Sequence, residues 1–181
     1  MKKENIYNIP NPITLLRVLL TIYLIYFIFT SSDALWIAAI FAIAAFTDFL
    51  DGFLARKLNQ VTTFGAKFDM LADRFLMIGT VLALMVHSKL NGFFTKYHVM
   101  QVVLIMMREM MTFPFAITNK KIPKAALVGK ITTFMQGITF PLIILSTTYH
   151  FFDFSIYFAV ATAIIGAYSA LTYIRSTDFI D

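Results

Sequence analysis

Six mostly apolar stretches of about 20 residues, the length that a helix needs to cross a bilayer, follow one another along this chain of 181 residues. Hydrophobic residues make up 59% of the chain and charged residues only 14%, a balance that soluble domains do not show. We therefore expect an all-α integral membrane protein with six transmembrane helices, forming a single membrane domain over residues 1–181. The expected spans are Ile13–Thr30, Ala34–Ala55, Gly65–His87, Tyr97–Ile117, Leu127–Thr148 and Phe154–Ile174.

Basic residues gather at the termini and in alternate loops of this arrangement, whereas the opposite loops hold only Lys89 and Lys96. Cytoplasmic loops of membrane proteins carry an excess of Lys and Arg. We therefore expect both termini to be cytoplasmic and the protein to lie in the inner (cytoplasmic) membrane. The residues on the expected cytoplasmic side are Lys2, Lys3, Arg56, Lys57, Lys120, Lys121, Lys124, Lys130 and Arg175.

The net charge of +5 suits anionic lipids and anionic substrates. No basic soluble surface is present for nucleic acid, so we expect no nucleic-acid partner. The chain has no cysteine, which excludes disulfides and thiolate chemistry.

Four of the ten acidic residues lie in one stretch between two apolar runs: Asp48, Asp51, Asp69 and Asp73. The first two are spaced i, i+3 and the last two i, i+4, so each pair shares one helix face. A polar break after Lys57 predicts a helical hairpin whose two aspartate faces turn toward each other. Carboxylates at membrane depth are unfavourable unless something compensates them, and hard divalent cations prefer such oxygen ligands. The stretch predicts a dicarboxylate metal site; the alternative is ion pairing with Arg56, Lys57, Lys67 and Arg74.

The full spacing of this stretch is D-x2-D-G-x2-A-R-x8-G-x3-D-x3-D, with Gly52, Ala55, Arg56 and Gly65 at the other fixed positions. It resembles the signature of the CDP-alcohol phosphatidyltransferases. The opening Asn8–Thr14 with Arg17, and the later elements Arg108-Glu109 and Gly129–Gln136, resemble the phosphatidylglycerophosphate synthase and cardiolipin synthase branches.

This resemblance implies transfer of a phosphatidyl group from CDP-diacylglycerol to an alcohol, with release of CMP and with two divalent metal ions, Mg²⁺ or Mn²⁺. Asp48 and Asp69 would bridge both metals, Asp51 would hold one, and Asp73 would ligate the other and accept the proton of the acceptor hydroxyl. The active site would face the cytoplasm, and the protein would be a homodimer. The residues that would contact CDP-diacylglycerol are Asn11, Thr14, Gly52, Arg56 and Thr62.

The acceptor would be held by basic side chains in or near the spans. Arg108 lies in the otherwise apolar stretch Val102–Phe115, and an arginine at membrane depth is a functional candidate; the alternative is an internal ion pair with Glu109. The other candidates are Lys124, Lys130 and Arg175, for which anchoring at the membrane interface is the alternative. For Arg17, inside the first span, the alternative to a functional role is a side chain that extends to the lipid headgroups.

Glycerol 3-phosphate is the first acceptor that we expect, ahead of phosphatidylglycerol (a cardiolipin synthase) and inositol phosphate. Thr132 stands where phosphatidylglycerophosphate synthases often have a lysine, which leaves these alternatives open. The non-enzyme alternative is a small cation transporter. Such a protein would be expected to carry polar residues on several spans, whereas these acids lie on a single hairpin.

Overall fold

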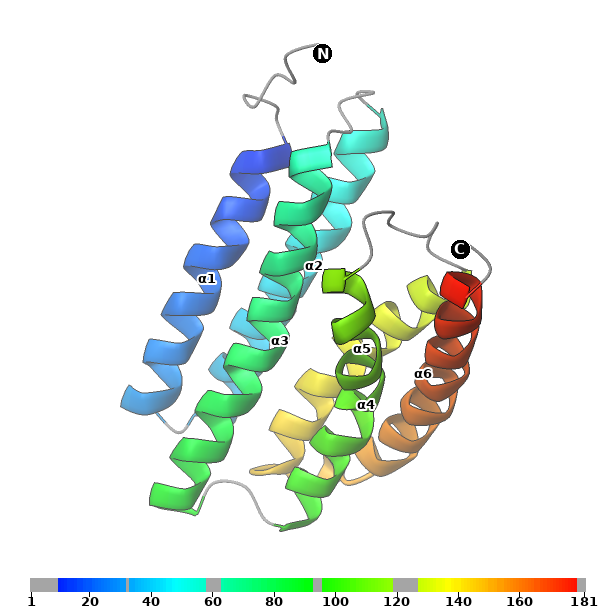
Figure 1. Ribbon diagram of the computed structural model, residues 1–181. Coiled ribbons are helices and arrows are strands. Elements are labelled where there is room, and N and C mark those ends of the chain that lie inside the picture. Colours follow the sequence, from blue (N-terminus) through cyan, green and yellow to red (C-terminus); the bar gives the residue numbers. More distant parts are fainter. Residues whose placement is uncertain (1–9, 32, 58–62, 93–95, 119–126, 179–181) are drawn as a thin grey trace. The chain divides into compact units, whose positions relative to one another are not determined.

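The structure is a computed structural model that describes residues 10–31, 33–57, 63–92, 96–118 and 127–178. Over these ranges the chain forms six α-helices, one short 3-10 helix and no strand. Each expected span coincides with one helix, so the all-helical fold class is confirmed. The α-helices are α1 (Pro10–Thr30), α2 (Ala34–Lys57), α3 (Thr63–Asn91), α4 (Lys96–Thr118), α5 (Leu127–Ser146) and α6 (Ser155–Asp178), with η1 (His150–Phe152) between the last two (Figure 1).

Local signals in the sequence set several of the helix ends. Asp33 caps the start of α2, where its Oδ1 accepts hydrogen bonds from the backbone N–H groups of Leu35 at 3.0 Å and Trp36 at 3.4 Å. Such a cap satisfies amide groups that the first turn leaves without helical partners. Gly92 follows the end of α3 with a φ of 69°, a conformation that favours glycine and commonly terminates a helix.

The chain divides into two compact units, Met1–Phe93 and Phe94–Asp181. In the first unit, α1 packs along both α2 and α3. Many of the buried side chains between these helices are apolar, and the largest apolar ones come from all three helices: Leu24, Ile28, Ile37, Phe41, Leu76 and Leu84.

In the second unit, α6 packs along both α4 and α5. Its core is also apolar, but hydroxyl and amide groups interrupt it. Gln136 donates to the backbone carbonyl of Ile105 at 2.9 Å, and the hydroxyl groups of Thr139 and Thr162 lie 2.9 Å apart. Pairing of this kind removes much of the penalty for burying polar groups.

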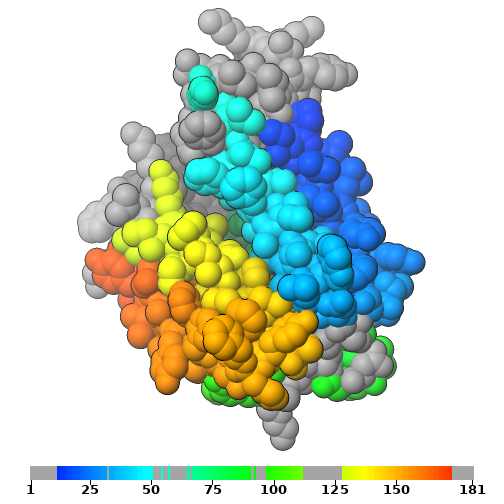
Figure 2. All heavy atoms as spheres, turned by 180° about the vertical axis from the view of Figure 1, so that it is seen from behind, coloured from blue at the N-terminus to red at the C-terminus, as the bar shows by residue number. Residues whose placement is uncertain are grey.

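Large apolar side chains also cover much of the outer surface. Ile22 and Tyr26 on α1 are 53% and 64% exposed, and Tyr157 and Ile164 on α6 are 76% and 66% exposed. Figure 2 shows side chains of both helices at the surface, α1 in blue and α6 in orange to red. Exposed apolar area on this scale is characteristic of a surface that contacts lipid.

Four segments among the described residues are long and apolar enough to cross a membrane: Pro12–Thr30, Lys67–Leu90, Val128–Ser146 and His150–Thr172. They fall on α1, α3, α5 and α6. On α2 the described residues include a shorter apolar segment, Ala34–Leu50. The structure thus supports an integral membrane protein, and the number of six spans stays a prediction.

Candidate active site

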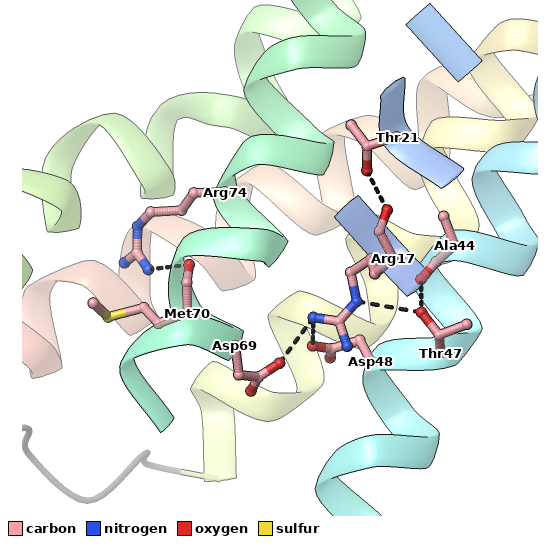
Figure 3. A network of polar contacts seen from close by, with 8 residues as sticks. All are labelled: Arg17, Thr21, Ala44, Thr47, Asp48, Asp69, Met70 and Arg74. Carbon is pink, nitrogen blue, oxygen red and sulfur yellow. Dashed lines mark hydrogen bonds and ion pairs between the residues drawn. The ribbon is translucent and has the colours of Figure 1, made fainter. Parts of the chain in front are cut away.

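Three helices of the first unit bring one cation and two acids together. Arg17 lies on α1, Asp48 on α2 and Asp69 on α3 (Figure 3). A single guanidinium nitrogen of Arg17, Nη1, lies 3.0 Å from Oδ1 of Asp48 and donates a hydrogen bond of 2.8 Å to Oδ1 of Asp69. The two aspartates therefore share one cationic neighbour, although the loop between α2 and α3 separates them in sequence.

The guanidinium of Arg17 makes a further hydrogen bond to a threonine of α2. Its Nε donates to the hydroxyl of Thr47 at 3.3 Å, and this hydroxyl donates in turn to the backbone carbonyl of Ala44 at 2.7 Å. The backbone carbonyl of Arg17 accepts a hydrogen bond from the hydroxyl of Thr21 at 2.8 Å. The arginine side chain is fully buried. A buried charge is tolerated when it is paired and hydrogen-bonded, and the two carboxylates and Thr47 meet this requirement.

The alternative in which Arg17 extends to the lipid headgroups is wrong. Its side chain turns inward because two carboxylates on the neighbouring helices compensate its charge. Ion pairing of the acids, the alternative to a metal site, is present at Asp48 and Asp69, but with a residue that the alternative did not name. The cation between Asp48 and Asp69 comes from α1, and it is not one of Arg56, Lys57, Lys67 and Arg74.

The other two aspartates of the motif lie on the same two helices. Asp73 follows Asp69 by one turn of α3 and is partly buried. Asp51 follows Asp48 by one turn of α2, and its side chain lies outside the described residues. Asp48 and Asp69 are thus brought together, and the contribution of Asp51 and Asp73 to one metal site stays a prediction.

The carboxylates of Asp48 and Asp69 fit hard divalent metal ions by donor type, since these ions take oxygen ligands. One cation already lies within 3.0 Å of an oxygen of each acid. The two acid side chains are 31% and 38% exposed, whereas Arg17 behind them is not exposed at all. The described side chains alone contain no group of three His, Cys, Asp or Glu residues that could hold a metal. Asp51, the expected third ligand, is not among them.

Four of the five residues predicted to contact CDP-diacylglycerol lie on α1 and at the end of α2. Thr14 is buried on α1, one turn before Arg17. Asn11 lies in the first turn of α1, and Gly52 and Arg56 lie on the last turns of α2. The side chains of Asn11 and Arg56 are outside the described residues, and so is the whole of Thr62.

A second charged centre lies in the second unit. Arg108 on α4 donates through Nη1 to Oε1 of Glu109 at 2.8 Å and to the hydroxyl of Thr133 on α5 at 3.3 Å. The side chain of Arg108 is 19% exposed and that of Glu109 is 10% exposed. The ion pair that was the alternative for Arg108 is therefore present, and part of the Arg108 side chain remains exposed.

Two glycines give Arg108 its space. A Cβ atom added to Gly129 on α5 would lie 3.4 Å from Nη2 of Arg108. One added to Gly166 on α6 would lie 3.3 Å from Cβ of Arg108 and 3.4 Å from Cγ2 of Thr132. The contact with Cβ of Arg108 at Gly166 would be tighter than most contacts in packed proteins, whereas the contact at Gly129 would be close to ordinary van der Waals distance. The missing side chain at Gly166 therefore lets α6 approach α4 closely beside Arg108.

A sequence profile for the CDP-alcohol phosphatidyltransferases matches residues 7–172. The chain belongs to the CDP-alcohol phosphatidyltransferase family. Among its relatives is a protein of Wigglesworthia glossinidia brevipalpis, 29% identical over 92% of both chains. One of Rickettsia felis is 32% identical over 77% of this chain and 76% of its own length. One of Pseudomonas fluorescens is 47% identical over 49% of this chain and 46% of its own length. All three are named CDP-diacylglycerol–glycerol-3-phosphate 3-phosphatidyltransferase.

The remaining basic residues that we predicted for the acceptor of this phosphatidyltransferase lie on or between helices of the second unit. Lys130 is exposed on the first turn of α5. Arg175 lies near the end of α6, with its side chain outside the described residues, and Lys124 lies outside them entirely. Their roles, like that of Arg108, stay predictions.

The sequence interpretation missed Arg17 as a residue of the aspartate cluster of this phosphatidyltransferase. A signal was present, since Arg17 is the only charged residue of α1. It also follows Thr14 at i, i+3, and both belong to the opening motif, so the motif marks one face of the helix. Gly129 belongs to an element that carries the family resemblance, whereas Gly166 beside Arg108 had no comparable signal.

Proposed function

We propose that the protein transfers the phosphatidyl group of CDP-diacylglycerol to glycerol 3-phosphate and releases CMP, as a phosphatidylglycerophosphate synthase. The observation that carries this proposal is the meeting of Asp48 and Asp69 at one cation, in a chain that keeps the aspartate spacing of its family. The names of relatives that match most of this chain support glycerol 3-phosphate as the acceptor.

The proposed setting is the inner membrane, crossed six times, with both termini and the active site facing the cytoplasm. Four strongly apolar helices and the many large apolar side chains on the outer surface support this setting. The basic residues at both ends of the chain support the orientation. The acyl chains of the substrate can then stay in the bilayer while the cytidine headgroup and a soluble acceptor meet at the aqueous surface. The proposed assembly is a homodimer, by likeness to the family.

The reaction forms one bond and breaks another. The acceptor hydroxyl oxygen attacks the phosphorus that carries the diacylglycerol. The bond from this phosphorus to the bridging oxygen of the diphosphate breaks, and CMP leaves with the electron pair. Asp73 takes the proton from the attacking hydroxyl, since a positioned carboxylate can act as a general base. Mg²⁺ or Mn²⁺ ions held by Asp48, Asp51, Asp69 and Asp73 would neutralise the diphosphate and stabilise the leaving CMP.

Two sets of residues would orient the substrates. Asn11, Thr14, Gly52, Arg56 and Thr62 would hold CDP-diacylglycerol. Arg108 would hold the phosphate of the acceptor, because a guanidinium presents parallel hydrogen bonds to a phosphate; its partial exposure supports this role. Lys124, Lys130 and Arg175 would draw the anionic acceptor toward the site.

Release of CMP from CDP-diacylglycerol by the purified protein tests the proposal. The assay uses a labelled lipid donor, Mg²⁺ or Mn²⁺, and three acceptors offered separately: glycerol 3-phosphate, phosphatidylglycerol and inositol phosphate. We expect CMP release that depends on metal and on glycerol 3-phosphate. Release with phosphatidylglycerol alone would make the protein a cardiolipin synthase. No metal-dependent release with any of the three would contradict the proposal.

A further inference from the structure

The aspartate cluster has an inner side and an outer side. Arg17 is fully buried, whereas the side chains of Asp48 and Asp69 are 31% and 38% exposed. The guanidinium therefore contacts the two acids on their buried side. Figure 3 shows it directed at both carboxylates. A metal ion or a substrate from the aqueous phase would meet the carboxylates from their exposed side.

One nitrogen of Arg17 contacts both acids, so its charge opposes their mutual repulsion at the point where they converge. Two like charges held close together favour separation or protonation of one of them. A cation between them offsets this repulsion when no metal is bound. Burial makes the contact strong, but loss of one partner would leave an uncompensated charge in the interior.

Thr47 restricts the orientation of the guanidinium. Its hydroxyl accepts from Nε of Arg17 at 3.3 Å and is itself tied to the carbonyl of Ala44 at 2.7 Å. Thr47 also directly precedes Asp48 on α2. The same turn of helix thus holds the arginine through a hydroxyl and presents a carboxylate to it.

We propose that Arg17, oriented by Thr47, is a positioning residue for the metal-binding aspartates. It holds Asp48 and Asp69 in converging positions before a metal arrives and remains behind them afterwards. This inference rests on the proposed function for the identity of the ligand, Mg²⁺ or Mn²⁺. The contacts of Arg17 themselves do not depend on it.

The first experiment compares Thr47→Val with Thr21→Val, two substitutions that remove a buried hydroxyl and leave the net charge unchanged. Thr47 bonds the guanidinium of Arg17, whereas the hydroxyl of Thr21, one turn further along α1, bonds the backbone carbonyl of Arg17. The probe is Mn²⁺ alone, measured as free ion by electron paramagnetic resonance. Changes in residues that orient metal ligands typically lower affinity about 10- to 100-fold, and we expect about tenfold for Thr47→Val and wild-type affinity for Thr21→Val. Equal affinities of the two variants would overturn the role of Thr47.

The second experiment measures the thermal unfolding of Arg17→Gln in EDTA and in saturating Mn²⁺. In EDTA the midpoint should fall on the order of 10 °C, because the substitution breaks a buried ion pair in a chain of this size. Mn²⁺ should reduce this loss, since the metal compensates the same carboxylates. The fall in the unfolding midpoint of Thr21→Val should be the same in EDTA and in Mn²⁺. Equal losses of Arg17→Gln in EDTA and in Mn²⁺ would mean that the arginine only fills space.

A double-mutant cycle in EDTA separates this inference from the proposed function. Asp48→Asn removes one of the charges that Arg17 compensates. The double variant Arg17→Gln, Asp48→Asn should therefore lose less stability than the sum of the losses of the two single variants. Additive losses would overturn the positioning role. If Arg17→Gln does not fold, the same cycle with Arg17→Lys decides the question. If Mn²⁺ stabilises none of the variants, nor the wild type, the metal-dependent function fails, and the cycle still decides the role of Arg17.

Discussion

Gly166 on α6 faces the base of the Arg108 side chain on α4, so closely that a Cβ atom at this glycine would lie 3.3 Å from Cβ of the arginine. The contacted atom is the Cβ of Arg108. Because Cβ is bonded directly to the backbone, it cannot move unless α4 moves with it. The absence of a side chain at residue 166 therefore sets how closely α4 and α6 approach at the charged centre of the second unit.

We expect Gly166→Ala to destabilise the protein and to reduce activity. Alanine favours a helix over glycine by about 1 kcal/mol, but overpacking typically costs about 1–3 kcal/mol. The matched control is Gly137→Ala on α5, where an added Cβ would meet nothing within 4 Å. Thermal unfolding should show a lower midpoint for Gly166→Ala and an unchanged or higher midpoint for Gly137→Ala. A gain in stability at both positions would show that α4 and α6 can separate without penalty.

The two aspartates beside Arg17 should be indispensable for turnover. Asp48→Asn and Asp69→Asn each remove one charge from the proposed metal site while nearly preserving side-chain volume. We expect CMP release to fall to background in both variants. The measurement is a Mg²⁺ titration of CMP release, with Asp33→Asn as the control, because Asp33 caps α2 at its opposite end. Near-wild-type rates at saturating Mg²⁺ in either variant would rule out the two-metal site.

Asp73 should affect the rate more than the binding of the donor. General-base catalysis typically contributes about 10²- to 10⁴-fold, and we expect Asp73→Asn to lower kcat within this range. Binding of CDP-diacylglycerol should persist, as measured by retention of the labelled lipid on the purified variant. A loss of lipid binding with an unchanged rate at saturation would instead make Asp73 a residue of the donor site.

The helices could be predicted from sequence because their signals are local. Apolar stretches long enough to cross a bilayer placed all six, and the start of α2 was found at Ala34, where Asp33 caps the helix. The expected end of α3 at His87 was too early. The helix continues to Asn91, because it ends where Gly92 adopts its positive φ and not where the apolar residues end.

The contacts of the site depend on packing, which the sequence expresses less directly. The spacing of Asp48 and Asp69 places each on a helix face, but it does not say which residue of α1 faces them. A single charge such as Arg17 in an apolar helix is compatible with extension to the headgroups or with an inward ion pair. The packing of α1 against both α2 and α3 is what turns Arg17 inward to Asp48 and Asp69. The space that Gly129 and Gly166 leave for Arg108 is also a property of packed helices.

Arg108 should determine the affinity for the acceptor. Its Nη1 already bonds Glu109 and Thr133, and the side chain remains partly exposed. A lysine keeps the charge but cannot offer the same planar set of donors to a phosphate. We therefore expect Arg108→Lys to raise KM for glycerol 3-phosphate by about tenfold, the equivalent of one lost charge-assisted hydrogen bond, and to change KM for CDP-diacylglycerol far less.

Steady-state CMP release, with each substrate varied in turn, measures both constants. The exposed Lys130 provides the control: Lys130→Arg changes one basic side chain for another at the start of α5, and both constants should stay near their wild-type values. Thermal unfolding of Arg108→Lys shows whether the Glu109 pair still supports the helices. An equal rise of both KM values would mean that Arg108 holds the fold or the donor. The acceptor phosphate would then have to be bound elsewhere among the basic residues of the second unit.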